Sequence, residues 1–170
     1  HTYLLEQESL FTPMTIRLAT LAEIDALNAL VERAVRGLST GYYTPGQIDS
    51  ALRYMFGIDT QLIHDGTYYV AEIDGQLAGC GGWSQRRTLY GGDQSKATAG
   101  PLLDSAREAG RIRAFFVHPN VARRGVGRAI LAACEAAAQQ AGFQRLELAA
   151  TLPGEPLYLA LGYTPDERTS

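Results

Sequence analysis

The stretch VHPNVARRGVGRAIL, residues 117–131, decides how the rest of the sequence is interpreted. It begins at the end of an apolar, strand-like run and ends in residues that favour a helix. Between the two lie adjacent arginines, Arg123 and Arg124, and two glycines, Gly125 and Gly127. Positive charge and bare backbone at the start of a helix are the features that a multiply charged anion needs.

A helix start attracts anions for reasons that lie in its backbone. Its first N–H groups have no partner inside the helix, and the aligned peptide dipoles place about half a positive charge there. Because Gly125 and Gly127 carry no side chains, an anion can approach the main chain closely. Arg123, Arg124 and Arg128 add mobile charge. Each helix-end interaction contributes only about 0.3–1 kcal/mol when exposed, so several donors must act together, and a diphosphate suits them.

Other interpretations of this stretch explain less. If the glycines only made a tight turn beside solvated arginines, two of them would not be needed in the first helical turn, where glycine costs roughly 1 kcal/mol relative to alanine. The dinucleotide-binding fingerprint G-x-G-x-x-G fails because Ile130 stands at its third glycine. The P-loop pattern fails because no G-K-[ST] is present.

Length and composition are those of an ordinary folded protein. The chain has 170 residues, enough for one domain with a sizeable hydrophobic core. Hydrophobic residues make up 46% and charged residues 19%, a balance that argues against disorder. The formal net charge of -3 argues against a nucleic-acid binder, because such proteins are usually basic. Any anion site must therefore be local.

The two cysteines and the start of the chain bear on its cellular setting. No metal-ligand spacing joins Cys80 and Cys134, so we expect two small buried thiols, no metal, and a reducing, cytoplasmic setting. No apolar run approaches the roughly 18 residues of a membrane span, so we expect no membrane partner. Residues 1–13, HTYLLEQESLFTP, lack the pattern of a signal peptide and are expected to be a tag remnant or an upstream extension outside the fold.

The first part of the chain alternates between strand and helix patterns. MTIRLAT, residues 14–20, predicts a strand. Thr20 and Glu23 form a capping box that starts a helix, which Gly37 is expected to end. Pro45 can open a second helix after the loop STGYYTPG.

The remaining chain contains a hairpin, a long loop and a crossover. Two apolar runs around Asp74-Gly75 predict a tight hairpin. A polar, Gly-rich loop follows, with a helical turn near 102–108, and loops this long are usually functional or mobile. A strand closed by Pro119, a helix over 125–141 and a strand over 143–151 form a crossover, which favours parallel pairing. This order of elements predicts an α/β domain with a mixed sheet.

The segment RAFFVHPNVARRGVGRAIL resembles the acetyl-CoA-binding motif of the GNAT superfamily of N-acetyltransferases. In that family the loop and helix start, typically Q/R-x-x-G-x-G/A, hold the pyrophosphate of coenzyme A. Residues 122–127 read A-R-R-G-V-G, so both glycines match, whereas Ala122 replaces the leading Gln/Arg and Arg123 or Arg124 can compensate. The cofactor-binding residues that the resemblance implies are Phe116, Val117, His118, Arg123, Arg124, Gly125, Val126, Gly127 and Arg128.

The same resemblance implies an α/β (α+β) fold with a mixed, mostly antiparallel central sheet, a parallel splayed pair and about four flanking helices. PLYLALGYTP, residues 156–165, is similar to the family's terminal Y-x-x-x-G-[FY] segment and predicts a short helix. Tyr158 stands where family members often protonate the coenzyme A thiolate, and an aromatic packed between helix and sheet is the alternative. Family members usually add a strand after this segment, but only seven residues follow Tyr163. We expect one N-acetyltransferase domain over residues 14–170, with that strand absent or supplied otherwise.

The implied reaction moves the acetyl group of acetyl-CoA directly to a primary amine of a small molecule or peptide. A backbone N–H near Val117 would polarise the carbonyl, and Tyr158 would give a proton to the departing sulfur. The amine must first lose a proton, because a lysine-like amine with a pKa near 10.4 is only about one part in a few thousand neutral at pH 7.

No general base is evident from the sequence. Arg111 and Arg113 stand where some relatives place a glutamate. Glu72 and Glu147 are the candidates, and a solvated or ion-paired strand residue is the alternative for each. His118 adjoins the motif, but a histidine before proline is common in the family without a catalytic role, and His64 is expected in a loop with no sign of function.

Aromatic and basic side chains near the first two helices and the long loop are candidates for substrate binding. These are Tyr42, Tyr43, Tyr54, Trp83, Arg86, Arg87 and Tyr90. One hypothesis is that Arg86 or Arg87 binds a carboxylate, which would make the acceptor acidic or amino-acid-like; a solvated basic turn is the alternative.

Two other functions would use the same helix start. One is a non-catalytic coenzyme A sensor or interaction module, and the other is a nucleotide-binding protein that would take ATP or NAD equally well. Neither the acceptor amine nor the oligomeric state follows from the sequence, and a homodimer is compatible with it.

Overall fold

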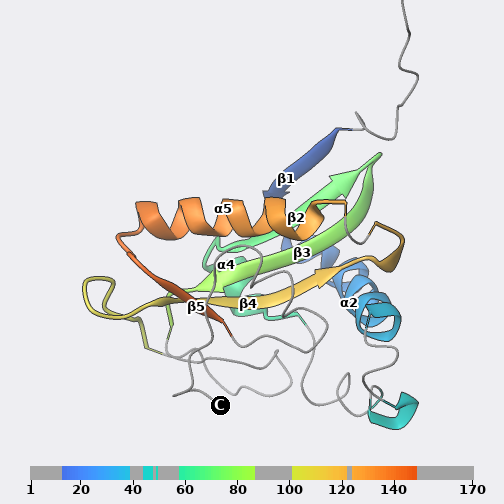
Figure 1. The fold of residues 1–170 in the computed structure, drawn as a ribbon, viewed down its shortest axis with the longest axis horizontal. Coiled ribbons are helices and arrows are strands. Elements are labelled where there is room, and N and C mark those ends of the chain that lie inside the picture. Colours follow the sequence, from blue (N-terminus) through green and yellow to red (C-terminus); the bar gives the residue numbers. More distant parts are fainter. Residues whose placement is uncertain are drawn as a thin grey trace, which may run out of the picture.

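Five strands of the described chain form one mixed sheet (Figure 1). The computed structural model describes residues 13–38, 44–47, 49, 58–86, 101–121 and 124–148. The strands lie in chain order across the sheet: β1 (Met14–Leu18), β2 (Tyr68–Ile73), β3 (Gln76–Ser84), β4 (Gly110–Val117) and β5 (Leu146–Leu148). The first three pairings are antiparallel, and β4 and β5 are parallel. The predicted fold class, mostly antiparallel with one parallel pair, is confirmed.

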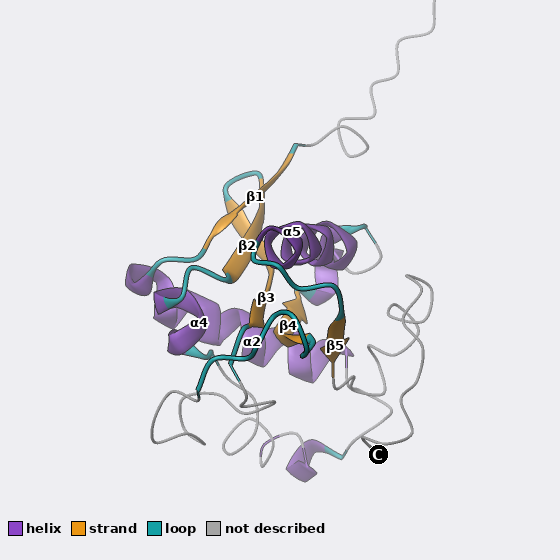
Figure 2. Ribbon diagram, turned by 90° about the vertical axis from the view of Figure 1, so that its left-hand side faces the viewer, coloured by secondary structure: helices purple, strands orange, loops and turns teal. Residues whose placement is uncertain are grey.

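Helices cover both faces of this sheet (Figure 2). The α5 helix (Val126–Gln140) lies on one face, while α2 (Ile24–Leu38) and the short α4 (Thr60–His64) lie on the other. A buried cluster fills each interface, with Leu27 and Leu62 under the α2 face and Ile130 under α5. Two short 3-10 turns, Leu21–Glu23 and Pro119–Val121, precede α2 and follow β4. Residues 45–47 and Asp49 are helical as expected, and the rest of the second predicted helix lies outside the described residues.

The predicted hairpin and crossover are both present. Asp74 and Gly75 turn with φ of 53° and 74°, the left-handed conformation that a tight turn requires. Strand β4 leads through α5 to β5, whose pairing with β4 covers Gly110–Ile112. The predicted helical turn in the long loop is a single turn in which Glu108 N–H donates to Asp104 O at 2.7 Å. The final predicted helix lies outside the described residues.

Two local predictions about the helices were wrong. Gly37 does not end the first helix but lies inside it; a Cβ there would stand 2.2 Å from Pro119 Cγ, so glycine lets that proline pack against α2. His64 does not lie in a loop but ends α4, which starts where the Asp59 carboxylate accepts the Gln61 N–H at 3.1 Å. The predicted cap at the first helix is confirmed in part, because Glu23 accepts the Thr20 N–H at 2.8 Å.

Both cysteines are buried and free, as expected. Burial raises the pKa of each thiol to about 12, so both stay protonated near neutral pH. Within the described part of the chain, no group of three or more His, Cys, Asp or Glu side chains is arranged to hold a metal ion. None of the described helices combines the length and the apolar character needed to span a bilayer.

We predict opposite effects for alanine at two helical glycines. Gly46→Ala should raise the free energy of unfolding by up to about 1 kcal/mol, because a Cβ there meets none of the described residues within 4 Å and alanine is the better helix former. Gly37→Ala should instead lower it by about 1–3 kcal/mol, because its Cβ would overlap Pro119. Urea unfolding of both variants measures the difference. Stabilisation by Gly37→Ala would contradict the close packing of α2 on Pro119.

Candidate active site

The site is organised by a bulge in β4. Pairing with β3 runs from Arg111↔Ser84 to Arg113↔Gly82, shifts by one residue, and resumes at Phe116↔Cys80. Two residues of β4, Ala114 and Phe115, therefore oppose Gly81 alone. Ala114 takes a φ of 55°, a left-handed conformation that is uncommon for alanine.

The bulge reverses which edge of β4 each backbone group faces. Before it, Gly110 N–H donates toward β5, to Arg145 O at 2.9 Å. In a regular strand every second residue faces the same edge, so His118 would face β5 too. His118 N–H instead donates toward β3, to Ala78 O at 2.8 Å. The neighbouring Val117 therefore directs its N–H and C=O toward the β5 edge, beyond the described pairing of β4 with β5.

The start of α5 lies close to this end of β4 (Figure 1). Gly125 precedes the helix with φ of 86°, and among the described residues a Cβ there would meet nothing within 4 Å. Hydrogen bonding of the helix begins with Ala129 N–H to Gly125 O at 3.0 Å. The N–H groups of Val126, Gly127 and Arg128 come before that bond, in the position where helices bind anions.

Close packing holds this helix start on the sheet. A Cβ at Gly79 of β3 would stand 2.7 Å from Val126 Cγ1 and 3.2 Å from Phe116 O. Val126 is 1% exposed, so its side chain serves packing. The glycine of β3 thus brings the ends of β4 and α5 together.

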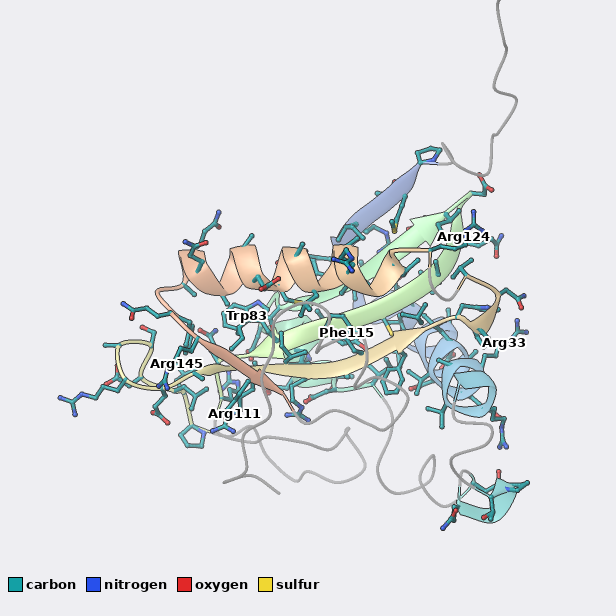
Figure 3. The ribbon with its side chains drawn as sticks, in the orientation of Figure 1. Arg33, Trp83, Arg111, Phe115, Arg124 and Arg145 are labelled. Carbon is teal, nitrogen blue, oxygen red and sulfur yellow. The ribbon has the colours of Figure 1, made fainter. Side chains whose placement is uncertain are left out.

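The other predicted cofactor residues lie along the same connection. His118 Nδ1 accepts the Asn120 N–H at 3.1 Å, which gives the imidazole a structural role in the turn after β4. Arg124 and Arg128 are exposed near the helix start, and Figure 3 shows Arg124 at the end of the sheet where β4 finishes. Ala122 and Arg123 lie outside the described residues.

Two predicted substrate residues are already engaged within the fold. Trp83 is 3% exposed and packs edge-on against Phe143, with ring centroids 5.6 Å apart, between the sheet and α5 (Figure 3). A substrate could not reach its ring without separating that helix from the sheet. Arg86 binds Asp65 through two bonds, Nε to Oδ2 at 2.8 Å and Nη2 to Oδ1 at 2.9 Å. Much of its charge is therefore compensated inside the protein.

Several predicted residues cannot be placed. Their positions lie outside the described part of the chain: Tyr42, Tyr43, Tyr54, Arg87, Tyr90 and Tyr158.

The two candidate bases occupy different parts of the sheet. Glu72 on β2 pairs with Arg17 of β1, two strands away from β4. Glu147 on β5 pairs with Arg111, opposite it on β4, at 2.8 Å, and the Glu147 side chain is 39% exposed. Arg113, two residues further along β4, is buried beside Asp59 with 3.4 Å between Nη2 and Oδ2. Of the two carboxylates, only that of Glu147 adjoins β4.

Comparison with known proteins identifies the family. A family model described as the acetyltransferase (GNAT) family matches residues 32–163. This chain belongs to the GNAT acetyltransferase family. A search of curated proteins finds no match.

Solved structures of GNAT proteins share the fold. A GCN5-related N-acetyltransferase from Ralstonia eutropha JMP134 is similar with a TM-score of 0.60 and 22% identity over 93% of this chain and 97% of that one. The PaiA N-acetyltransferase from Thermoplasma acidophilum in complex with coenzyme A has a TM-score of 0.67 at 12% identity, covering 91% and 92%. The aminoglycoside N-acetyltransferase AAC(6')-Iy in complex with CoA has a TM-score of 0.58 at 16% identity, covering 92% and 91%.

The geometry of this GNAT domain fits a long ligand with a diphosphate. The left-handed Gly125 and the N–H groups behind it suit the diphosphate. The outward-facing backbone of Val117 suits an extended arm with amide groups, which can pair with a strand edge. Coenzyme A has both parts.

We predict that Asp65→Asn destabilises this acetyltransferase in a pH-dependent way. The hydrogen bond from Arg86 lowers the pKa of Asp65, so the pair stabilises the folded state above the ordinary Asp pKa of about 3.9 and stops doing so as the pH falls through the folded value. The variant should lose about 1–3 kcal/mol at pH 7. Urea unfolding between pH 7 and 3 should show the two proteins converging as the pH falls.

Asp104→Asn is the matched control, because Asp104 is exposed and 3.8 Å from its partner Arg107. It should change stability by less than about 0.5 kcal/mol at any pH. A gap between wild type and Asp65→Asn that stays constant down to pH 3 would contradict the ionic character of the pair.

Proposed function

We propose that this protein transfers the acetyl group of acetyl-CoA directly to a primary amine of a small molecule or peptide. The observation that supports this best is the backbone of Val117, which the bulge directs away from β3 and toward the β5 edge, at the same end of the sheet as the start of α5. An extended arm along β4 and a diphosphate at α5 are then held by adjoining parts of the chain. The domain would span residues 14–170.

The backbone at these two places would do the binding. The N–H groups of Val126, Gly127 and Arg128 would hold the diphosphate, with Arg123, Arg124 and the Arg128 side chain adding charge. Phe116, Val117 and His118 would hold the arm, with the N–H and C=O of Val117 making the hydrogen bonds. Acetyl-CoA supplies an activated acetyl thioester when bound. A backbone N–H near Val117 would polarise its carbonyl oxygen, and Tyr158 would give a proton to the sulfur.

Glu147 is the better candidate for the residue that receives the proton of the amine. It lies beside β4, on the sheet face away from α5, because Leu146 and Ile112 pack toward α5 and the alternation of each strand turns Glu147 and Arg111 to the other side. Helix α2, one of the expected substrate elements, covers that same face. Arg111 fixes the carboxylate. Because Arg111 lies six residues before Val117, about 20 Å along β4, the proton of the amine would reach Glu147 through a chain of water molecules.

We predict that Glu147→Gln lowers kcat/KM at neutral pH by about 10²-fold, a loss typical of a missing general base. The loss should shrink as the pH approaches the pKa of the amine, because a neutral amine needs no base. Steady-state rates between pH 7 and 10 measure it. Glu72→Gln is the matched control and should leave the profile unchanged. If Glu147→Gln lowered kcat/KM by the same factor at every pH, the carboxylate would have a structural role and would not act as a base.

Ligand-induced stabilisation tests the proposed donor. Acetyl-CoA or coenzyme A at about 100 times its dissociation constant should add roughly 2.7 kcal/mol and raise Tm by about 5–10 °C. ATP and NAD at the same concentration should shift Tm far less, because they lack the amide-bearing arm that Val117 would pair with. Thermal unfolding with each ligand gives the result. Equal shifts for all ligands, or none, would overturn the proposal.

Binding without catalysis would indicate a different function. If coenzyme A stabilises the protein, no amine of a broad panel is acetylated and Tyr158→Phe changes nothing, the domain is a coenzyme A sensor. An acceptor panel also tests the role of Arg86: anionic amines that react no better than neutral ones would exclude a carboxylate-binding arginine.

A further inference from the structure

A buried tyrosine lies directly behind the bulge of β4. Tyr68, the first residue of β2, is 0% exposed, and its hydroxyl donates to Ala114 O at 2.8 Å. Ala114 is the bulge residue with a φ of 55°. The phenol therefore donates a hydrogen bond to the carbonyl of Ala114, a bulge residue that has no partner of its own in the pairing with β3.

The contact spans a whole strand, and β3 is shaped to allow it. Strand β3 lies between β2 and β4, so the Tyr68 ring must pass under it. At Gly82 a Cβ would stand 2.7 Å from Tyr68 Cδ1, and at Gly81 it would stand 2.5 Å from the Phe115 ring. Both glycines leave room for aromatic rings on opposite faces of the bulge, since Tyr68 belongs to the α2 cluster and Phe115 to the α5 cluster.

The hydrogen bond holds a conformation that the chain would otherwise leave. A left-handed alanine costs roughly 1–2 kcal/mol relative to the right-handed form. A half-buried carbonyl such as that of Ala114 adds a further cost of up to about 1–3 kcal/mol when it has no partner. Burial keeps the pKa of Tyr68 well above its ordinary value, so the hydroxyl remains a donor throughout the working pH range.

We propose that Tyr68 is a positioning residue that fixes the β4 bulge and thereby turns the Val117 backbone toward coenzyme A. This inference rests on the proposed function. If the bulge was lost or moved beyond Val117, the strand would keep the alternation seen at Gly110 as far as that residue, and Val117 N–H would face β3. The hydroxyl of Tyr68 would thus set the direction of a hydrogen-bond donor three residues beyond the carbonyl that it contacts.

The test is a pair of substitutions with one expected rescue. Tyr68→Phe removes only the hydroxyl and should raise the dissociation constant of coenzyme A about tenfold, as measured by titration calorimetry. Adding Ala114→Gly should restore affinity to within about threefold, because glycine adopts positive φ without strain. A structural role alone would not produce this rescue, since glycine normally loosens a strand.

Two matched controls separate positioning from general loss of stability. Tyr69→Phe removes the hydroxyl of the next residue, whose side chain packs toward α5, and should leave affinity unchanged. Val31→Ala, a cavity in the cluster that contains Tyr68, should lower Tm without weakening coenzyme A binding. If Tyr68→Phe binds coenzyme A like the wild type, if the double variant is not rescued, or if Val31→Ala loses the same affinity, the proposal is wrong.

Hydrogen exchange without ligand makes the inference independent of the proposed function. The His118 amide, bonded to Ala78 O, should exchange at least about tenfold faster in Tyr68→Phe and return toward the wild-type rate in the double variant. A wild-type protein that binds no coenzyme A overturns the proposed function, while the exchange rates still decide the role of Tyr68. Unchanged exchange at His118 in Tyr68→Phe overturns the positioning role.

Discussion

The one-residue shift between β3 and β4 is the constraint on which the rest of this structure depends. Successive residues of a β-strand direct their N–H and C=O groups to opposite edges. Regular pairing along one edge therefore fixes which N–H and C=O groups face the other edge. The extra residue at Ala114 reverses the edge that the N–H and C=O groups of all later β4 residues face. It assigns Gly110 and Val117, which lie an odd number of positions apart, to the same edge of β4.

The glycines of β3 follow from this constraint. Gly79 admits Val126 and thus the start of α5, Gly81 admits the Phe115 ring, and Gly82 admits Tyr68. Any side chain at these positions would separate the layers that the site needs in contact. Glycine ordinarily weakens a strand, and here the contacts from both faces offset that weakness by closer packing of the two helical layers.

Much of the fold could be predicted because it depends on local patterns. The Asp74-Gly75 turn, the crossover through α5 and the glycine before that helix carry sequence signals that act over a few residues. The motif at Gly125 and Gly127 located the proposed binding region for the same reason. The prediction that Gly37 ends the first helix was wrong because glycine both ends helices and allows close neighbours. Only the position of Pro119 distinguishes the two roles.

The features that could not be predicted depend on contacts distant in the chain. Ala114 gives no sign of a left-handed conformation, since its φ is imposed by pairing with β3 and by a hydroxyl 46 residues earlier. Trp83 and Arg86 look like surface residues of a loop until Phe143 and Asp65 are placed beside them.

The ion pairs around β4 bear on the acceptor amine. Arg86, Arg111 and Arg113 each face a carboxylate, Asp65, Glu147 and Asp59 respectively, so three positive charges on this part of the protein are compensated internally. A substrate carboxylate would have to compete with these partners, which weakens the case for an acidic acceptor. An ammonium group would compete with Arg111 for Glu147 in the same way, but that carboxylate is partly exposed, so a second donor can approach it. Proton transfer to it would leave the neutral amine that the reaction needs.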